Sequence, residues 1–147
     1  MDEIKREILL SYPAIKMFKL VNDIEDYPKF IPACVSSKII SKDAKELIAS
    51  LGFQKAGLSY SFTTKNSLGK INDDYSINLE LVDGPLNYLS GYWKFKDLNG
   101  EGSKVSLELK FEIDNILLKN LFAPVIDKVA DKLIAAFSQR ADEVYGG

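Results

Sequence analysis

The chain has 147 residues, of which 46% are hydrophobic and 27% charged, and its formal net charge is −2. This length is typical of one domain, and the aromatic content of 11% excludes an intrinsically disordered chain. Lys, Asp or Glu interrupts every apolar run before the roughly 18 residues that a membrane-spanning helix needs. The charged start, MDEIKREILLSYP, resembles neither a secretory signal nor a transit peptide, so we expect a single cytoplasmic domain over residues 1–147.

The cysteine and histidine content limits the chemistry. The sequence has no histidine, which excludes imidazole bases and His-ligated metal sites, and its single cysteine excludes an internal disulfide and thiolate zinc sites. As a nucleophile, Cys34 would need a neighbouring cation or helix start to lower its pKa, and we predict a packed, inert thiol instead. No metal site is expected. An enzyme would have to use Asp, Glu, Tyr or Lys alone, so a binding role is favoured.

The first part of the chain is predicted to form a strand and two short helices. Loosely alternating apolar residues over 3–10 indicate a strand. Pro13 is suited to the first turn of a helix, which is predicted to reach about Asn22. The segment 23–34 contains two prolines, each of which disfavours helix in the residue before it, so this segment forms at most a short second helix.

The middle of the chain has a period of two, which indicates strands. The predicted strands span residues 35–40, 46–53, 58–65, 75–81, 89–96 and 105–113. One apolar and one polar face per strand predicts an antiparallel sheet with one solvated side.

Asp83 would need an apolar site and a partner to act as a general base, and we interpret Asp83-Gly84-Pro85 as a turn.

The last segment has the periodicity of a helix. Apolar residues recur at spacings of three and four from Leu118 to Val144 and predict a long C-terminal helix. Pro124 would clash with the carbonyl of Asn120, so the helix either begins near Pro124 or is kinked there. Only this helix is long and apolar enough to cover the sheet. We therefore predict an α+β fold in which a curved antiparallel sheet of about seven strands wraps around the C-terminal helix, with room for an apolar ligand.

Four strings of residues resemble a known protein family. They are YPKFIPAC (27–34), FTTKN (62–66), LVDGPLNYLSGYWKF (81–95) and RADEVY (140–145). In this order they are similar to the coenzyme Q-binding proteins and ribosome-association toxins (RatA) of the START-like, polyketide-cyclase-related superfamily. The resemblance implies the helix-grip (START-like) fold, in agreement with the packing predicted above. It also implies a bacterial member, because mitochondrial members carry a transit peptide and the start of this sequence does not resemble one.

The resemblance implies a protein without catalysis that binds a hydrophobic isoprenoid lipid in a tunnel under the C-terminal helix and supports respiratory quinone handling. Ubiquinone or another isoprenoid quinone is the implied ligand, and no covalent cofactor or DNA partner is expected. The alternative is a toxin that binds the large ribosomal subunit and inhibits subunit association. A third hypothesis is a cyclase or dehydratase, which would need a carboxylate and a tyrosine together in the cavity, and the alternation offers no such pair.

The candidate ligand-binding residues are large apolar side chains expected to face the space between sheet and helix. They are Phe53, Tyr60, Phe62, Leu81, Trp93, Phe95, Phe111, Phe122, Ile126, Val129, Leu133 and Phe137. A quinone head also needs a hydrogen-bond donor, and Trp93 is preferred over Tyr60 and Tyr92. The same residue types would equally form a filled core, so the sequence leaves both alternatives open.

Two further sets of residues are candidates for contacts with larger partners. Tyr27, Phe30 and Ile31, stiffened by neighbouring prolines, are expected to be exposed as a ligand gate or as a lip that touches the inner membrane transiently; a rigid packed loop is the alternative. Binding to RNA needs clustered basic residues. Lys38, Lys42 and Lys45 are therefore the candidates for ribosome contact, although ordinary solvated lysines are favoured.

Overall fold

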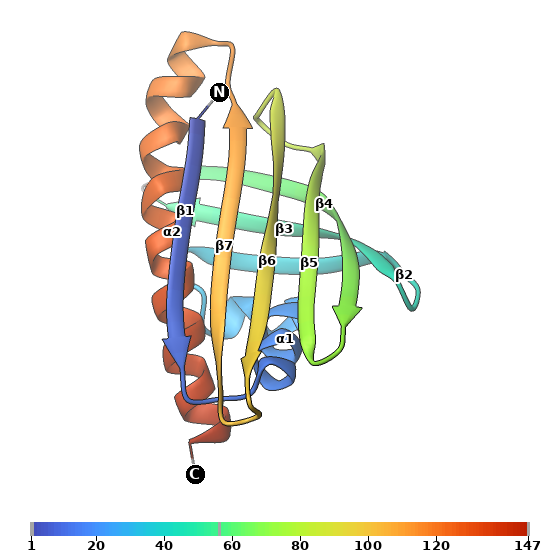
Figure 1. The fold of residues 1–147 in the computed structure, drawn as a ribbon. Coiled ribbons are helices and arrows are strands. Elements are labelled where there is room, and N and C mark those ends of the chain that lie inside the picture. The colour runs from blue at the N-terminus through green and yellow to red at the C-terminus, as the bar shows by residue number, and fades with distance from the viewer. Residues whose placement is uncertain (1, 56, 147) are drawn as a thin grey trace.

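A computed structural model of the chain describes residues 2–55 and 57–146. Seven strands form one antiparallel sheet, and three helical segments pack against it among the described residues (Figure 1). In chain order the elements are β1 (Asp2–Leu10), α1 (Ala14–Asn22), the 3₁₀ helix η1 (Ile24–Lys29), β2 (Cys34–Lys42), β3 (Glu46–Lys55), β4 (Leu58–Ile71), β5 (Asp74–Asp83), β6 (Tyr88–Leu98), β7 (Gly102–Glu112) and α2 (Ile116–Tyr145).

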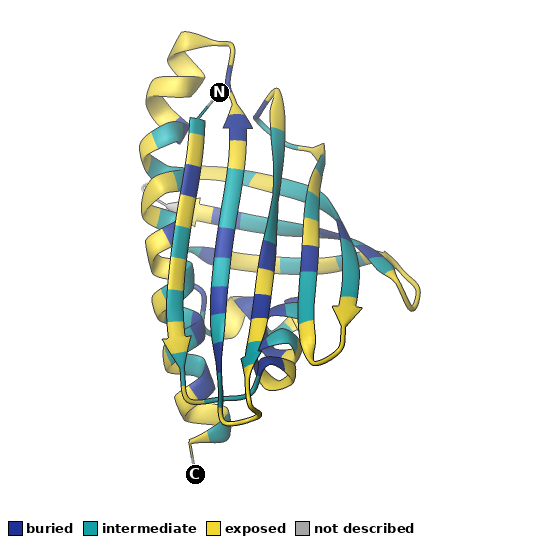
Figure 2. Cartoon of the chain, viewed as in Figure 1, coloured by how far each residue is buried: buried dark blue, intermediate teal, exposed yellow. Residues whose placement is uncertain are grey.

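The sheet follows the order β1-β7-β6-β5-β4-β3-β2, with β1 and β2 at its two edges. It curves strongly, so that β2 and β3 run across behind β1 and β7 in Figure 1. In Figure 2, exposed residues alternate with buried or intermediate ones along β1, and buried residues alternate with intermediate ones along most of β7, because successive side chains of a strand point to opposite faces. On the concave face, Trp93 of β6 pairs with Ile77 of β5 and Leu107 of β7, and all three are buried.

A glycine permits close contact between two central strands. A Cβ atom on Gly91 of β6 would lie 2.1 Å from the carbonyl oxygen of Glu108 on β7. No side chain fits at that distance, so only glycine is compatible with the approach of the two backbones. Gly91 belongs to the longest of the strings on which the family resemblance rests.

The two helical segments after β1 close one end of the curved sheet. α1 begins directly after Pro13, and its first backbone N–H, of Ala14, donates to Asp97 Oδ1 at 2.9 Å. Its buried face packs against the ends of β5, β6 and β7. In η1, the Tyr27 hydroxyl donates to the carbonyl oxygen of Val21 and ties this segment to α1.

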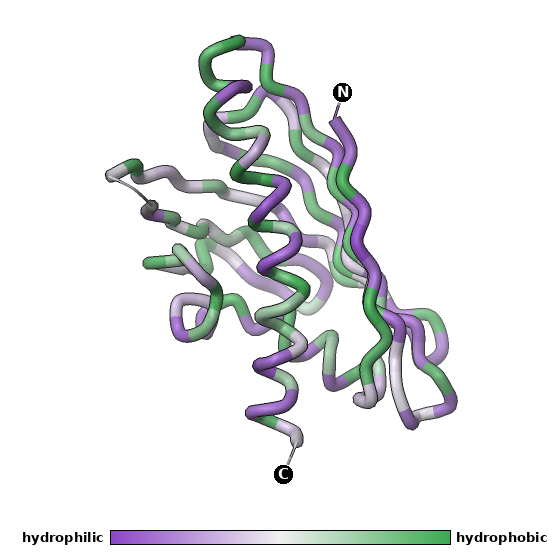
Figure 3. Tube along the Cα trace, turned by 90° about the vertical axis from the view of Figure 1, so that its left-hand side faces the viewer, coloured by the Kyte–Doolittle hydropathy of each residue, from purple (hydrophilic) through white to green (hydrophobic). Residues whose placement is uncertain are grey.

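The C-terminal helix α2 lies across the open side of the sheet, and hydrophobic and hydrophilic residues alternate along it in Figure 3. The Asn115 side chain caps its first turn by accepting hydrogen bonds from the N–H groups of Leu117 and Leu118. Arg6 of β1 pairs with Asp127 and Asp131, which fixes the middle of α2 to the edge strand.

The predicted fold class is confirmed: a curved antiparallel sheet of seven strands wraps around a long C-terminal helix among the described residues. Of the two alternatives expected at Pro124, the start of α2 near this residue is wrong, since the helix starts at Ile116 and continues through the proline. Pro124 lies in the third turn, where its missing N–H leaves the carbonyl of Asn120 without its helical partner. In the described part of the chain, no helix has the length and hydropathy needed to cross a membrane.

Candidate ligand-binding site

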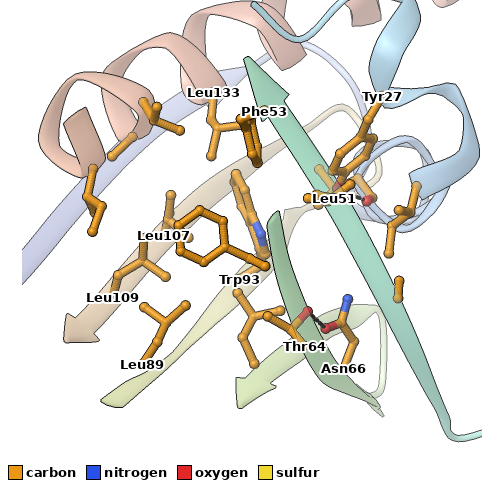
Figure 4. A pocket seen from close by; sticks show the side chains of 18 of the residues that line it. Tyr27, Leu51, Phe53, Thr64, Asn66, Leu89, Trp93, Leu107, Leu109 and Leu133 are labelled. Carbon is orange, nitrogen blue, oxygen red and sulfur yellow. Dashed lines mark hydrogen bonds between the residues drawn. The ribbon is translucent and has the colours of Figure 1, made fainter. Parts of the chain in front are cut away.

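An apolar cavity of about 160 Å³ lies between the concave face of the sheet and α2. Its walls come from α1, η1, the strands β3 to β7 and α2. Figure 4 shows Phe53, Trp93, Leu107 and Leu133 converging on it from three sides. An engineered apolar cavity of roughly 150 Å³ accepts benzene, so this space matches one six-membered ring. A larger ligand would extend beyond it, because drug-sized ligands occupy roughly 300–1,000 Å³.

The cavity has a closed end and a more open side. At the closed end Val21, Ala49 and Ile77 are almost fully buried. Toward β4 and α2 the lining side chains, including Tyr60 and Ile126, are only partly buried. Between β4 and α2 the rings of Tyr60 and Phe122 pack edge to face, with centroids 5.2 Å apart.

Few polar groups line the cavity. Thr64 Oγ1 donates to Asn66 Oδ1 at 2.7 Å, the bond drawn as a dashed line in Figure 4. The Tyr27 hydroxyl is occupied by the carbonyl of Val21. Among the described residues, neither the Tyr60 hydroxyl nor Trp93 Nε1 has a hydrogen-bond partner, so both are free to donate to a ligand.

The cavity carries no formal charge. None of the described residues that line it is Asp, Glu, Lys, Arg or Cys. Burial raises the pKa of Tyr27 far above its usual value, and burial also raises the pKa of Tyr60. Both phenols therefore stay protonated at neutral pH, and the site offers an uncharged ligand donors within an apolar wall.

The family of the chain follows from its sequence. The family model described as "Polyketide cyclase / dehydrase and lipid transport" matches residues 10–138. The chain belongs to this family. The ribosome association toxin RatA of Escherichia coli is 39% identical over 145 residues, which cover 99% of this chain and 90% of that protein. The mitochondrial coenzyme Q-binding protein COQ10 homolog B of Xenopus laevis is 25% identical over 146 residues, covering 94% of this chain and 57% of that protein.

Solved structures of other proteins share the fold of this chain. The Streptomyces ZhuI aromatase/cyclase superposes with a TM-score of 0.84 at 14% identity, over 99% of this chain and 98% of that one. The STAR-related lipid transfer protein of Xanthomonas axonopodis superposes with a TM-score of 0.75 at 14% identity, over 94% and 84% of the two chains. At such identities they establish the fold alone, the START-like helix-grip fold, and the predicted family resemblance is confirmed.

Nine of the twelve predicted ligand-binding residues line the cavity: Phe53, Tyr60, Phe62, Trp93, Phe122, Ile126, Val129, Leu133 and Phe137. The prediction is wrong for the other three, which lie outside the lining. Phe95 is completely buried and packs edge-on against Phe18 of α1. Phe111 is buried near the far end of β7, and Leu81 lies beside Gly84 at the end of β5. Each faces the concave side as the alternation predicted, but beyond the ends of the cavity.

The prediction that Tyr27, Phe30 and Ile31 are exposed as a ligand gate or membrane lip is wrong. Tyr27 and Ile31 are buried, and the N–H of Ile31 donates to the carbonyl of Tyr27 at 2.9 Å. Phe30 is half-buried between the rings of Tyr27 and Phe137, with the guanidinium of Arg140 5.2 Å from its centroid. The segment is the rigid packed loop of the alternative reading, because its rings turn inward against α2.

The three candidate lysines are exposed but do not form a single surface. Lys38 and Lys42 lie on the edge strand β2, and Lys45 lies in the turn that follows. Lys38 pairs with Ser50, next to the inward-facing Ala49, whereas Lys42 pairs with the buried Leu47. A bulge between the two changes the face. The strand register therefore places Lys38 and Lys42 on opposite faces of the sheet.

Three further predictions concern single residues. Tyr92 points to the outer face, where its hydroxyl donates to Glu108, so it is wrong as a donor to a ligand in the cavity. Asp83 is exposed at the end of β5 and outside the cavity, as expected of a turn residue. Cys34 is buried, in agreement with the predicted packed thiol, and burial raises its pKa.

Sequence reasoning missed the polar pair of the cavity, Thr64 and Asn66. A signal was present, because Asn66 follows Tyr60, Phe62 and Thr64 at intervals of two. The predicted strand ended at residue 65, whereas β4 continues to Ile71 and carries Asn66 on its inner face. Several smaller aliphatic lining residues, such as Leu51 and Leu79, were in the correct phase but were not named as candidates.

Proposed function

We propose that this protein binds the ring of an isoprenoid quinone, ubiquinone or a close relative, in the cavity under α2 without changing it chemically. The observation that supports this best is an uncharged cavity of about 160 Å³, sized for one ring and lined almost entirely by apolar side chains. The name of the Xenopus relative, a coenzyme Q-binding protein, points to the same class of ligand.

The isoprenoid tail would supply most of the affinity. Each buried CH₂ contributes roughly 0.8 kcal/mol, and association costs on the order of 4–15 kcal/mol in lost freedom of motion. A few isoprene units offset that cost if they lie along apolar side chains. The partly buried Tyr60, Phe62, Ile126 and Leu133 provide such a path away from the closed end.

We propose a binding protein rather than an enzyme, because the cavity lacks the groups that acid–base chemistry needs. Fold relatives include aromatase/cyclases, so the fold itself permits catalysis. General acid–base catalysis requires a titratable side chain within hydrogen-bond reach of the substrate. Within the described lining only the phenols of Tyr27 and Tyr60 are ionisable, and burial raises the pKa of both.

The intrinsic fluorescence of the protein tests this function. Trp93 is the single tryptophan and lines the cavity, so a bound quinone should quench its emission. We expect ubiquinone with two isoprene units to quench the Trp93 emission in a saturable way. An excess of farnesol, which competes for the cavity but does not quench, should restore the emission. A linear response equal to that of free N-acetyltryptophanamide would contradict the proposal.

Association with the ribosome is the second candidate, favoured by the name of the Escherichia coli relative at 39% identity. The exposed Lys38, Lys42 and Lys45 lie along the β2 edge rather than on one face of the sheet, and from that edge they would contribute contacts to the large ribosomal subunit that weaken with salt. Co-sedimentation with purified subunits tests this, and changing all three lysines to Glu should abolish it. The matched control changes Lys94, Lys96 and Lys110, which are exposed on β6 and β7, to Glu. If both triple variants lost co-sedimentation equally, the contact would not be specific to the β2 edge.

A carrier of a membrane quinone would collect its ligand at a bilayer, and we propose a cytoplasmic protein in transient contact with the inner membrane. With Tyr27 and Ile31 buried, the apolar side chains available for that contact are Ile116, Leu117 and Leu121, which are exposed at the start of α2. Changing these three to Ser should abolish flotation with liposomes of phosphatidylethanolamine and phosphatidylglycerol. Undiminished flotation would contradict the assignment.

A further inference from the structure

One polar side chain in the cavity has an unused hydrogen-bonding group. Asn66 is only 5% exposed and lies on β4 between Leu47 of β3 and Leu79 of β5. Its oxygen accepts the hydroxyl hydrogen of Thr64 at 2.7 Å. Among the described residues, no group accepts a hydrogen bond from its amide nitrogen, which carries two hydrogens. In the part of the chain that the structure describes, the fully buried side-chain atoms without a hydrogen-bond partner are Asn22 Oδ1 and Ser103 Oγ, so the amide nitrogen of Asn66 keeps accessible surface that a ligand atom could reach.

The bond to Thr64 fixes which way the amide faces. Because Oδ1 is held by the Thr64 hydroxyl, Nδ2 must point away from Thr64, as Figure 4 shows for its blue atom. Both residues line the cavity. Thr64 thus acts as a positioning residue that turns the donor of Asn66 away from itself.

The surroundings of Asn66 define what it would bind. Its strand neighbours Leu47 and Leu79 are aliphatic, and the lining includes no charged side chain among the described residues. An amide N–H in such a place pairs best with a neutral acceptor, since a charged ligand group would lose its hydration without an opposite charge. A ring carbonyl is a neutral acceptor that enters a cavity of about 160 Å³.

We propose that Asn66 donates a hydrogen bond to a carbonyl oxygen on the ring of the ligand and so determines which head groups the cavity accepts. This inference rests on the proposed function and names the residue that recognises the head. The ring enters first and reaches Asn66, and the tail leaves between β4 and α2 past Tyr60 and Ile126. A site that donates to a buried oxygen discriminates strongly against ligands that lack it, because the donor is then left unpaired.

The experiment compares two probes in three proteins. The probes are ubiquinone with two isoprene units, which has ring carbonyls, and farnesol, which has a tail without a ring. The proteins are the natural chain, Asn66→Leu and the matched control Asn78→Leu, which makes the same change at an exposed position of β5. Trp93 remains in all three and reports quinone binding by quenching, while calorimetry reports farnesol.

We expect Asn66→Leu to weaken quinone binding about tenfold, which corresponds to roughly 1.4 kcal/mol, and to change farnesol binding less than threefold. Asn78→Leu should leave both unchanged. The melting temperature of the ligand-free Asn66→Leu protein should change little, since the substitution removes an amide nitrogen without a partner and leaves the Thr64 hydroxyl without its acceptor. Asn66→Asp keeps the size and the bond from Thr64, and its ionised carboxylate has no donor and would face the ring oxygen with a negative charge, so at pH 8 it should lose at least as much quinone affinity.

Three results would overturn the inference. Quinone binding by Asn66→Leu within threefold of the natural protein would show that Asn66 does not recognise the head. Equal loss of quinone and farnesol affinity, or a sharp fall in melting temperature in both Asn66 variants, would assign Asn66 a structural role. If the natural protein binds neither probe, the proposed function itself fails, and that result is distinguishable because it does not depend on any substitution.

Discussion

Phe137 connects α2 to the rest of the molecule, and its removal gives a quantitative prediction. The side chain is 2% exposed. Its ring centroid lies 5.3 Å from Tyr27, 5.4 Å from Phe30 and 5.5 Å from Trp93, each in an edge-to-face arrangement. Replacing a buried Phe by Ala costs about 3–5 kcal/mol from lost burial and the cavity left behind. Each aromatic pair adds about 0.5–1.5 kcal/mol beyond burial, so we expect a value in the upper half of that range.

Urea unfolding followed by circular dichroism measures this change. The free energy of unfolding of Phe137→Ala should fall by about 4 kcal/mol, a large part of the 5–15 kcal/mol typical of a domain. The matched control is Leu121→Ala on the same helix, because Leu121 is 42% exposed. Away from the core, a substitution usually changes stability by less than about 0.5 kcal/mol. If the free energy of unfolding of Phe137→Ala fell by less than about 1 kcal/mol, the Phe137 ring would not be a main packing contact of α2.

Three further predictions concern the cavity, a turn and the cysteine. Ile126→Trp should fill the cavity and abolish quinone binding measured by calorimetry, whereas Leu121→Trp, on the exposed side of α2, should not. The backbone N–H groups of Lys45 and Glu46 donate to the Asp43 carboxylate, which lowers its pKa below 3.8. Asp43 therefore stabilises the fold above its unfolded pKa, and that contribution is lost as pH falls through the folded pKa. Asp43→Asn should lessen the loss of stability on acidification below about pH 4, and an unchanged acid profile would contradict this. Burial and a raised pKa should make native Cys34 react with Ellman's reagent at least tenfold more slowly than in the urea-unfolded chain, and equal rates would contradict the packed thiol.

Local patterns predict the fold well because they carry its periodicities. Period-two alternation places Trp93 and Leu107 on the same concave face, and the structure pairs them directly. The three- and four-residue spacing predicts α2, although Pro124 left two alternatives open, a helix start near it or a kink in a longer helix. A proline costs one helical hydrogen bond and some strain, and burial of the helix on both sides of Pro124, at Phe122 and Ala130, outweighs that cost.

The hollow space itself could not be predicted. Its lining brings together residues from distant elements, including small ones such as Ala49 on β3 and Ala130 on α2. Which residues oppose one another is set by strand register and helix rotation, and neither is encoded in a local pattern. For the same reason the sequence left the packing of Tyr27 open between an exposed gate and a rigid packed loop, because its partners Val21 and Phe137 come from different helices.

The central claim is that the cavity under α2 holds a quinone in the native protein. Mass spectrometry of organic extracts from protein purified out of a quinone-producing bacterium tests this most directly. We expect an isoprenoid quinone at close to one molecule per chain, and none from an equal amount of the Ile126→Trp protein. Extracts that contain no quinone, or as much quinone from the filled variant as from the natural protein, would contradict it.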